Sequence, residues 1–476
     1  MSKRRSFDTC FNTATGKQVT RRSLVKSVAG AGALAAAGSA VFAVPMVNAQ
    51  EKAPVTFWTT FTDVGLNSLQ ASADMFNAAS TTYEVEVVQR PPADVDDSSS
   101  LITAVRGGEG PDTYLLDRFI VAERAAQGLL QDLTPFMEAA GDNPDLTEKF
   151  VGFSAEEATY NGAPFALPHD TDVRALFYNI DLLTEKGVDL APYDKANGPM
   201  TWDAFAESIA AVDADAGDNF ETLGFVPYVG QGWHYTYGYS HFGEFFDYEA
   251  CQVSPDNENV QKGWQWVYDY CNSYGADKMY QFVQTEMRTG AATTDAAFIQ
   301  GRLGSWVNGN WMFANFAKYT PDVNIGYTYI PVPAEGDSSV TWAGGWSVVV
   351  PEGAKNPEGG YEFAKYLCGP EGSRTYTELN NNLPVLKELL TDASLFTEDL
   401  KWFVDELFPT TRVRPPLPVG ARYWSEMTDA WQAIYLNSAD PASAAAQVKQ
   451  AVQGDLDAGG FCPIAEPAAP VSTPAS

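Results

Sequence analysis

Hydrophobic and polar positions follow two different periods over residues 55–116. The stretch 83–88, Tyr-Glu-Val-Glu-Val-Val, has the period of two that predicts a strand. Residues 66–78 carry apolar positions at helical spacing, and the glycine pair 107–108 is typical of the end of a second helix. The pattern predicts, in order, strand 55–58, helix 66–78, strand 83–88, helix 101–106 and strand 113–116. This alternation indicates an α/β fold, with a parallel sheet covered by helices on both faces.

Capping signals predict further helices along the chain. Ser154–Glu157 has the pattern of a capping box, and Thr201 precedes a run with apolar positions at helical spacing. Asn356 and Ser254 are each followed by proline, which is favoured at the first position of a helix. We therefore expect helices to begin at these four points.

The first 49 residues differ from the rest of the chain. They carry seven of the 30 Lys and Arg residues but only one acid, Asp8. No charge occurs between Lys26 and Glu51, and Val47-Asn48-Ala49 is a small-residue cleavage pattern. The segment 20–26 resembles the twin-arginine export signal. The layout predicts a signal peptide over residues 1–49 and an exported protein of the periplasm or extracellular cell surface, with an uncleaved N-terminal anchor as the alternative.

Composition and charge narrow the possible partners. The 476 residues are 45 % hydrophobic and 19 % charged, which is typical of a globular chain and not of a disordered one. Acids outnumber basic residues by 61 to 30, so the net charge is −31. A protein that binds nucleic acid or an anionic membrane surface needs a basic face, so we expect neither partner.

Four cysteines follow the signal segment: Cys251, Cys271, Cys368 and Cys462. In an oxidising compartment they can pair in three ways, or they can remain free thiols. A helix from Ser254 would place Cys271 about 24 Å along its axis, whereas a disulfide needs Cα atoms within about 7 Å. We therefore expect Cys251 and Cys271 not to be bonded to each other, unless that helix breaks.

Short motifs with a characteristic order extend from residue 108 to residue 384. They are Gly108–Asp117, Gly128–Pro135, Asn161–Pro168, Arg174–Asn179, Pro199–Trp202, Phe298–Trp311, Ala343–Trp346, Pro370–Gly372 and Leu383–Pro384. In order and spacing the series resembles the sugar-binding, maltose-binding-like class of extracellular solute-binding proteins of ABC importers, over about residues 55–456. Each motif is weak alone, and the resemblance rests on their order behind an export signal.

The resemblance implies a periplasmic-binding-protein type fold, in which two α/β lobes with parallel-dominated sheets are joined by hinge segments. The expected N-terminal lobe comprises residues 50–170 with 331–383, and the C-terminal lobe comprises 171–330 with 384–460. Residues 461–476, rich in Pro and Ala, are expected to be a disordered tail. The ligand would lie in the cleft between the lobes.

A sugar ring has an apolar face and a rim of hydroxyl groups, so its site needs aromatic planes beside carboxylate, amide and guanidinium groups. Trp311 and Trp346 follow glycine motifs in family segments that face the cleft, and we expect them on opposite lobes. Asp117 follows a strand whose carboxyl end should border a ligand. The expected ligand-binding residues are Trp58, Thr60, Asp63, Asp117, Arg118, Asp170, Asp172, Arg174, Trp233, Asn310, Trp311, Gly345, Trp346, Arg422, Tyr423 and Trp424. Core packing is the alternative for each aromatic residue, and a surface ion pair is the alternative for Asp117 with Arg118.

No motif indicates catalysis. The chain has three His and neither a C-x-x-C nor a P-loop pattern, so we expect no catalytic residues, metal ligands or cofactor. The expected function is that of a monomeric, non-enzymatic sugar-binding protein that delivers its ligand to the transmembrane subunits of an ABC permease. A secreted carbohydrate-active enzyme of the glycoside hydrolase type and a binding protein for a non-sugar solute are the alternatives.

Overall fold

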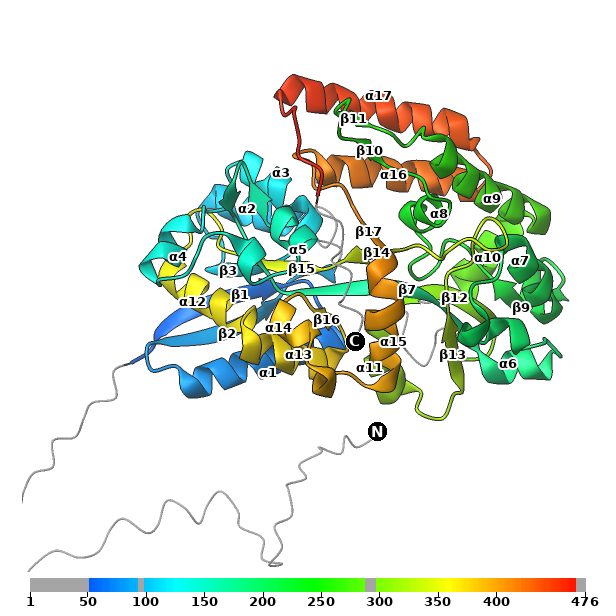
Figure 1. The fold of residues 1–476 in the computed structure, drawn as a ribbon, viewed down its shortest axis with the longest axis horizontal. Helices are drawn as coiled ribbons and strands as arrows, with labels where there is room; N and C mark the ends of the chain where they lie inside the picture. The colour runs from blue at the N-terminus through cyan, green and yellow to red at the C-terminus, as the bar shows by residue number, and fades with distance from the viewer. Residues whose placement is uncertain (1–50, 93–97, 287–296, 468–476) are drawn as a thin grey trace, which may run out of the picture. The chain divides into compact units, whose positions relative to one another are not determined.

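The computed structural model of the chain describes residues 51–92, 98–286 and 297–467. The described residues all belong to the larger of the two units into which the chain divides, and the predicted signal peptide, residues 1–49, lies outside them. Within the described ranges, no helix is long and apolar enough to cross a membrane. The elements of the larger unit gather around two sheets (Figure 1).

The first sheet has five strands, and we call this sheet with the helices packed on it the N-lobe. Its order is β2 (Tyr83–Gln89), β1 (Ala53–Thr59), β3 (Thr113–Asp117), β15 (Trp346–Val349) and β6 (Leu167–Pro168). β1 pairs in parallel with β2 and β3, as the periodicity predicted. The connecting helices are α1 (Asp63–Ala79) and α2 (Ser99–Gly107), and α2 ends at Gly108 with a left-handed φ of 71°. The other helices and strands before residue 169 are α3 (Val121–Ala126), α4 (Thr134–Ala139), α5 (Gly152–Glu157), β4 (Thr159–Tyr160) and β5 (Ala163–Pro164). Two helices, α12 (Pro357–Leu367) and α13 (Pro370–Asn380), follow β15 directly in the chain.

The second sheet has eight strands, and we call this sheet with its helices the C-lobe. Its order is β17 (Thr411–Val413), β14 (Thr341–Gly344), β7 (Asp170–Asn179), β12 (Leu303–Gly309), β9 (Asn219–Phe225) and β8 (Ala214–Ala216), while β13 (Ile325–Thr328) and β16 (Leu383–Pro384) also pair with β7. β7 pairs antiparallel with β12, β13, β14 and β16. The expectation of parallel-dominated sheets is therefore wrong for this sheet. That expectation extended the pattern of residues 55–116, whereas strands later in the chain return along β7 in the opposite direction.

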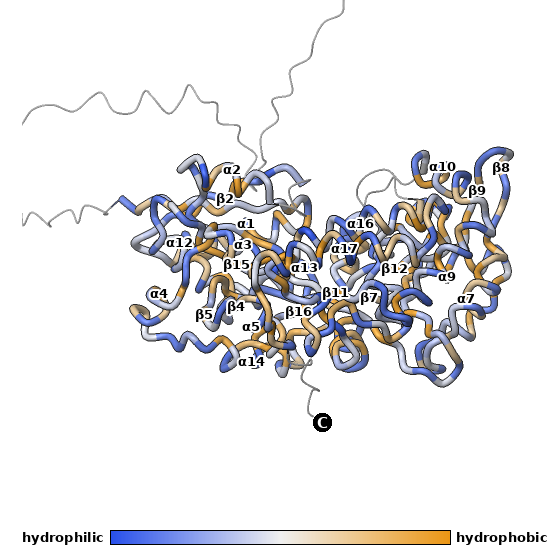
Figure 2. The backbone as a smooth tube through the Cα atoms, turned by 90° about the horizontal axis from the view of Figure 1, so that it is seen from above, coloured by the Kyte–Doolittle hydropathy of each residue, from blue (hydrophilic) through white to orange (hydrophobic). Residues whose placement is uncertain are grey.

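The remaining helices surround the second sheet or follow it in the chain. They are α6 (Ile180–Glu185), α7 (Trp202–Ile209), α8 (His234–Ser240), α9 (Glu258–Tyr274), α10 (Ala276–Glu286), α11 (Met312–Tyr319), α14 (Lys387–Leu390), α15 (Glu398–Trp402), α16 (Gly420–Tyr435) and α17 (Pro441–Gly459). Two views agree that α4 and α12 lie on one side of the unit, that α7, α9 and α10 lie on the other, and that β7 lies between them. Figure 2 also shows hydrophobic stretches among the elements on both sides of β7, and the buried hydrophobic residues of both lobes form one connected core.

Two of the four predicted helix starts agree with the structure. Thr201 caps α7, and Asn356 caps α12, each through its side-chain oxygen. Ser154 instead lies inside α5, and its hydroxyl donates to a backbone carbonyl, so the capping-box prediction is wrong. The helix predicted from Ser254 begins at α9, where Asn257 accepts from two backbone N–H groups. An Asn cap three residues further on thus replaces the expected Ser-Pro start.

A disulfide joins Cys251 to Cys462 across 211 residues of chain, and Cys271 and Cys368 are buried free thiols. The prediction that Cys251 and Cys271 are not bonded to each other is confirmed. Cys251 lies between β10 (Phe246–Asp247) and β11 (Gln252–Val253), so the bond attaches the segment after α17 to this loop. Residues 461–467 of the expected disordered tail are therefore held in place, while 468–476 lie outside the described residues.

Candidate ligand-binding cleft

A cavity of about 620 Å³ opens where the two sheets meet, with walls from both lobes. Thr60 follows β1, and Asp117 ends β3, so the N-lobe contributes residues at the carboxyl ends of neighbouring parallel strands. This end of a parallel sheet is where open α/β folds bind ligands. From the C-lobe come Arg174 in β7, Trp311 after β12 and Arg414 after β17.

Aromatic rings form much of the wall. Trp233, Trp311 and Trp346 are half-buried and line the cavity, so part of each indole remains open to a ligand. Phe61 meets Trp346 edge to face, with ring centroids 4.6 Å apart. Trp233 is backed by buried Trp424 at 5.2 Å, which limits the freedom of the exposed ring. Fixed, partly exposed aromatic planes of this kind suit the apolar face of a sugar ring.

Two glycines are required where the strands reach the cleft. A Cβ atom on Gly309 would lie 1.9 Å from the ring of Trp311, so only glycine leaves room for the observed indole position. Gly345 has a φ of 139°, and a Cβ there would lie 2.4 Å from the carbonyl oxygen of Asp170. Both glycines precede a tryptophan of the cleft. Gly309 leaves room for the Trp311 ring, and Gly345 leaves room for the Asp170 carbonyl and the Arg118 guanidinium.

Ion pairs connect the charged groups of the cleft. Arg414 donates two hydrogen bonds to the carboxylate of Asp117, at 3.1 and 2.6 Å, and thereby joins the two lobes. Arg174 pairs with Asp172 and lies over the ring of Trp342, with its Cζ 3.5 Å from the centroid. Burial lowers the pKa of Arg174 to about 10, although the charge of Asp172 opposes the shift, so Arg174 is protonated at neutral pH.

Ten of the sixteen expected ligand-binding residues line this cavity. They are Thr60, Asp63, Asp117, Asp172, Arg174, Trp233, Trp311, Gly345, Trp346 and Trp424. Trp311 follows β12 of the C-lobe, and Trp346 begins β15 of the N-lobe, so the two half-buried rings come from different lobes as expected. These ten residues therefore lie on the wall of the cavity, as expected for ligand-binding residues. That any of them binds a ligand remains a prediction.

The other six expected residues do not line the cavity. Three of them, Arg118, Asp170 and Asn310, are buried where the chain passes between the two sheets, a region that we call the junction. Arg118 is 1 % exposed and donates to Glu157 at 2.6 Å and to backbone carbonyls of β7 and β14. Asp170 accepts from the N–H of Trp346 and the amide of Asn382. Asn310 accepts from the N–H of Val173 and donates to the carbonyl of Asn381. Each is buried because its polar atoms satisfy the backbone at the junction.

Asp170 is unusual among these junction residues because burial raises its pKa to about 7, with the negative charge of Asp172 adding to the effect and hydrogen bonds from Asn382 and Trp346 opposing it.

The remaining three expected residues lie outside the junction as well as the cavity. Trp58 lies beneath Arg90, whose Cζ is 4.2 Å from its ring centroid. Arg422 pairs with Glu426 on the surface of α16, and Tyr423 donates to the carbonyl of Phe245 in the core.

Sequence reasoning missed several lining residues: Phe61, Thr62, Gln231, Met312, Asn315, Trp342, Asn380, Asn382 and Arg414. Trp342 is adjacent to the motif Ala343–Trp346, so proximity to a motif was its only signal. Arg414 lies in Thr-Arg-Val-Arg-Pro-Pro, residues 411–416, where nothing distinguishes it from Arg412. Its place is set by the pairing of β17 with β14, which brings the end of this segment to the cleft.

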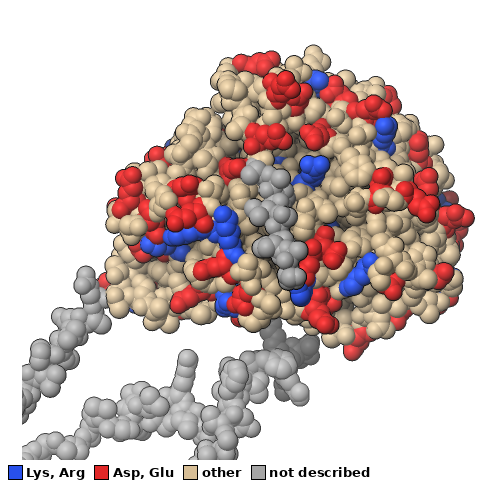
Figure 3. Space-filling view, in the orientation of Figure 1, with Lys and Arg blue, Asp and Glu red and all other residues tan. Residues whose placement is uncertain are grey.

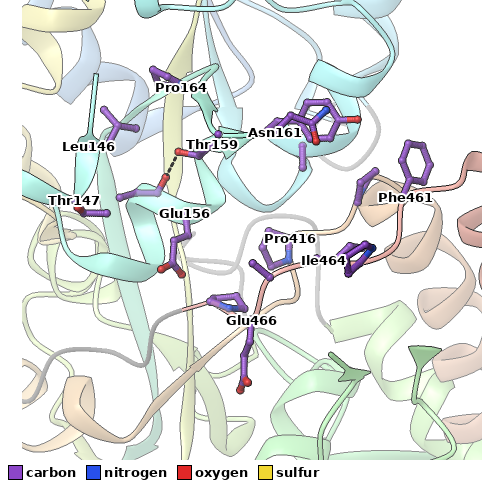
Figure 4. A pocket seen from close by; sticks show the side chains of 18 of the residues that line it. Leu146, Thr147, Glu156, Thr159, Asn161, Pro164, Pro416, Phe461, Ile464 and Glu466 are labelled. Carbon is purple, nitrogen blue, oxygen red and sulfur yellow. Dashed lines mark hydrogen bonds between the residues drawn. The ribbon is translucent and has the colours of Figure 1, made fainter. Parts of the chain in front are cut away.

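A larger cavity, of about 830 Å³, lies on another part of the unit (Figure 4). Residues near α5 and β4, including Glu156, Thr159 and Asn161, line it from one side, and Pro416, Ile464 and Glu466 line it from the other. Its described lining has no Trp, Arg or Lys. We therefore take the smaller cavity as the candidate site, because it combines strand ends, tryptophan planes and paired charges. Among the described residues, no group of His, Cys, Asp and Glu is arranged to hold a metal ion.

Comparisons with known proteins identify a matching family and curated relatives. Residues 71–402 match the family model described as bacterial extracellular solute-binding protein. The galactooligosaccharide-binding protein of Bacillus subtilis (strain 168) is 23 % identical over 378 residues, which cover 79 % of this chain and 83 % of that protein. The maltotriose-binding protein of Pyrococcus abyssi is 21 % identical over 386 residues, covering 79 % and 76 % of the two chains.

Solved structures share the fold. "CpMnBP1 with Mannobiose Bound" superposes with a TM-score of 0.73 at 20 % identity, covering 84 % of this chain and all of that chain. The Thermus thermophilus maltotriose binding protein bound with maltotriose gives a TM-score of 0.64 at 21 % identity, covering 84 % and 99 % of the chains. These similarities confirm the expected two-lobed α/β architecture.

Proposed function

The chain belongs to the bacterial extracellular solute-binding protein family, and from the cleft we propose that it binds an oligosaccharide and delivers it to the permease of an ABC importer. The observation that carries the proposal is the lining of the 620 Å³ cavity by partly exposed Trp233, Trp311 and Trp346 beside paired carboxylates and arginines. Its volume is within the range of about 300–1,000 Å³ typical of pockets that enclose ligands of several rings.

The two-lobed arrangement supports a cycle of opening and closure. A ligand that contacts Trp346 on one lobe and Trp311 on the other stabilises the closed form through contacts that the open form lacks. Only this difference in contacts can shift the equilibrium between the two forms. We propose that the closed form, as a monomer, is what docks on the transmembrane subunits.

Location is part of the same proposal. The charge-free run before Glu51 and the arginine pair of residues 21–22 support export by the twin-arginine route, to the periplasm or the extracellular cell surface. The family description, extracellular, supports the same compartment.

A thermal-shift screen of the mature protein against neutral di-, tri- and tetrasaccharides tests the function. A sugar present at 100 times its dissociation constant should stabilise the fold by about 2.7 kcal/mol. Amino acids, peptides and polyol phosphates serve as the comparison set. Stabilisation by one of these solutes, with none by any saccharide, would contradict the proposal and favour a non-sugar ligand.

The alternative function, glycoside hydrolysis, would require a particular pair of carboxyl groups in the cleft. A glycoside hydrolase needs one carboxylic acid that is protonated at working pH beside a second, ionised carboxylate. The lining carboxylates Asp63, Asp117 and Asp172 are each engaged by a cation. Asp170, the neighbouring carboxyl whose pKa burial raises to about 7, is buried and does not line the cavity. This arrangement supports binding without hydrolysis. We expect the best-binding oligosaccharide to remain intact after prolonged incubation, as measured by chromatography.

A further inference from the structure

Among the described residues, the charged side chains that line the cleft balance one another. They are Asp63, Asp117, Asp172, Arg174 and Arg414, and the pairs are Asp63–Lys318, Asp117–Arg414 and Asp172–Arg174. With Lys318 included, three negative charges meet three positive ones. The protein as a whole has a net charge of −31, and acidic side chains predominate over much of the face shown in Figure 3. The cleft is therefore a locally neutral site in an acidic protein.

Two of these pairs join the lobes. Asp63 of α1 pairs with Lys318 of α11 at an exposed position, whereas Asp117 and Arg414 pair at a more buried position in the wall of the cleft. Two guanidinium nitrogens of Arg414 bind the two carboxylate oxygens, a bidentate geometry that is stronger than a single contact. The guanidinium also lies 3.9 Å from the ring centroid of Phe119. The side chain of Arg414 is 5 % exposed and that of Asp117 is 16 % exposed, so the carboxylate is the more accessible partner.

The second arginine of the cleft is fixed by more partners. Arg174 binds Asp172, the side chain of Gln231 and the carbonyl of Trp342, and Asp172 in turn accepts the N–H of Gly344. These bonds connect neighbouring strands of the C-lobe sheet, and their primary role is to hold β7 beside β14. Of the two pairs that join the lobes, Asp117 with Arg414 is the more shielded from solvent, and it can respond to a ligand without disturbing the bonds between β7 and β14.

We propose that the Asp117–Arg414 ion pair restricts the cleft to uncharged saccharides, an inference that rests on the proposed sugar-binding function. A ligand hydroxyl can donate to a free lone pair of the Asp117 carboxylate while the ion pair stays intact. A carboxylate on the ligand would instead meet the negative charge of Asp117, and it could reach Arg414 only by separating the bidentate pair. The same pair thus accepts neutral sugars and rejects their acidic derivatives.

The experiment compares one neutral oligosaccharide, the best binder of the saccharide screen, with its derivative in which a terminal hydroxymethyl group is oxidised to carboxylate. Calorimetry on the wild-type protein should give at least about tenfold weaker binding of the oxidised sugar, or about 1.4 kcal/mol. Asp117→Asn removes the competing charge and frees Arg414, so it should strengthen binding of the oxidised sugar. The ratio of the dissociation constant for the oxidised sugar to that for the neutral sugar should fall by at least tenfold. Arg414→Gln leaves Asp117 unpaired and should change the ratio in the opposite direction.

A matched control is Asp142→Asn, which removes the same charge from a carboxylate that is 17 % exposed, close to the 16 % of Asp117, and that pairs with Lys149 and Lys365 outside the cleft. This variant should leave the ratio of the two affinities unchanged. Equal or tighter binding of the oxidised sugar by the wild-type protein, or a ratio that Asp117→Asn and Arg414→Gln leave unchanged, would overturn the proposal while sugar binding itself stands. If no saccharide binds the wild-type protein, the proposed function fails and this inference fails with it. The comparison on wild-type protein decides the matter even if a variant does not fold.

Discussion

Removal of the Trp311 side chain should separate ligand binding from stability. The indole is half-buried, lines the cleft and lies 5.5 Å from the Arg174 guanidinium carbon. A sugar that covers about 80 Å² of this ring gains about 2 kcal/mol at about 25 cal/mol per Å². Trp311→Ala should therefore weaken oligosaccharide binding about 30-fold. Calorimetry against the sugar identified by thermal shift measures this loss.

The chain offers a matched control on the strand that precedes Trp311. Trp306 in β12 is fully buried and stacks on Phe298 with ring centroids 4.9 Å apart. Trp306→Ala should lower the free energy of unfolding by about 3–5 kcal/mol, as tryptophan truncations in cores do. Trp311→Ala should lower it by much less, because part of the indole already faces solvent. Chemical denaturation without ligand measures both variants.

A second variant perturbs the position of the Trp311 ring without removing the ring. A Cβ on Gly309 would occupy the position of the Trp311 indole, so Gly309→Ala should displace the ring and weaken sugar binding as well. The reasoning is refuted if Trp311→Ala keeps its affinity within about threefold of the wild type. It is equally refuted if Trp311→Ala destabilises the apo protein as much as Trp306→Ala does, since Trp311 would then be a core residue.

Four further predictions concern the rest of the molecule. Reduction of the Cys251–Cys462 bond should lower stability by about 2–4 kcal/mol, and alkylation of the denatured, unreduced mature chain should label only Cys271 and Cys368; a Cys251–Cys271 cross-link in a peptide map would contradict this. Burial raises the pKa of Asp170 from 3.8 to about 7, so the contribution of its protonated form to stability is present below pH 3.8 and is lost as the pH rises through about 7. Asp170→Asn should make the melting temperature depend less on pH between these two values. An unchanged dependence of melting temperature on pH would argue against this prediction. Raising NaCl from about 0.1 to about 1 M shortens the Debye length from about 10 to about 3 Å, so at a net charge of −31 it should raise the melting temperature, and a lower melting temperature would show that self-repulsion is not limiting. The exported protein should begin at Gln50, and N-terminal sequencing that finds Met1 would reject cleavage.

Local signals in the sequence determined the elements. The period of two at residues 83–88 became β2, and Thr201 and Asn356 cap α7 and α12, because side-chain alternation and capping depend on neighbours in the chain. Ser154 and Ser254 show the limit of such signals. Both carry a plausible cap pattern, yet the hydroxyl of each donates to a backbone carbonyl and the adjacent helices begin elsewhere.

We chose the sixteen expected residues from the sequence, mainly from the order of the motifs and from the ends of the first predicted strands. Ten of them lie on the wall of the cleft. Asp170 and Asp172 illustrate why the other six could not be separated from them. The two acids stand two positions apart on one strand and look equivalent in sequence. β16 pairs beside Asp170, and Asn382 binds its carboxylate, whereas Asp172 faces the cleft with Arg174. A contact made by residue 382 is not visible in the sequence around residue 170.

The sequence by itself therefore indicated the family, the α/β elements, many of the aromatic and charged residues of the site, and that Cys251 and Cys271 should not be bonded to each other. Only the tertiary structure decided which acids and arginines pair, that Cys251 bonds Cys462, and that Arg414 and Trp342 belong to the cleft. The physical reason is the range of the interactions. Helix periodicity, caps and turns act over a few residues, whereas burial and ion pairing depend on segments such as β3 and β17, about 300 residues apart in the chain, that meet only after both sheets have formed.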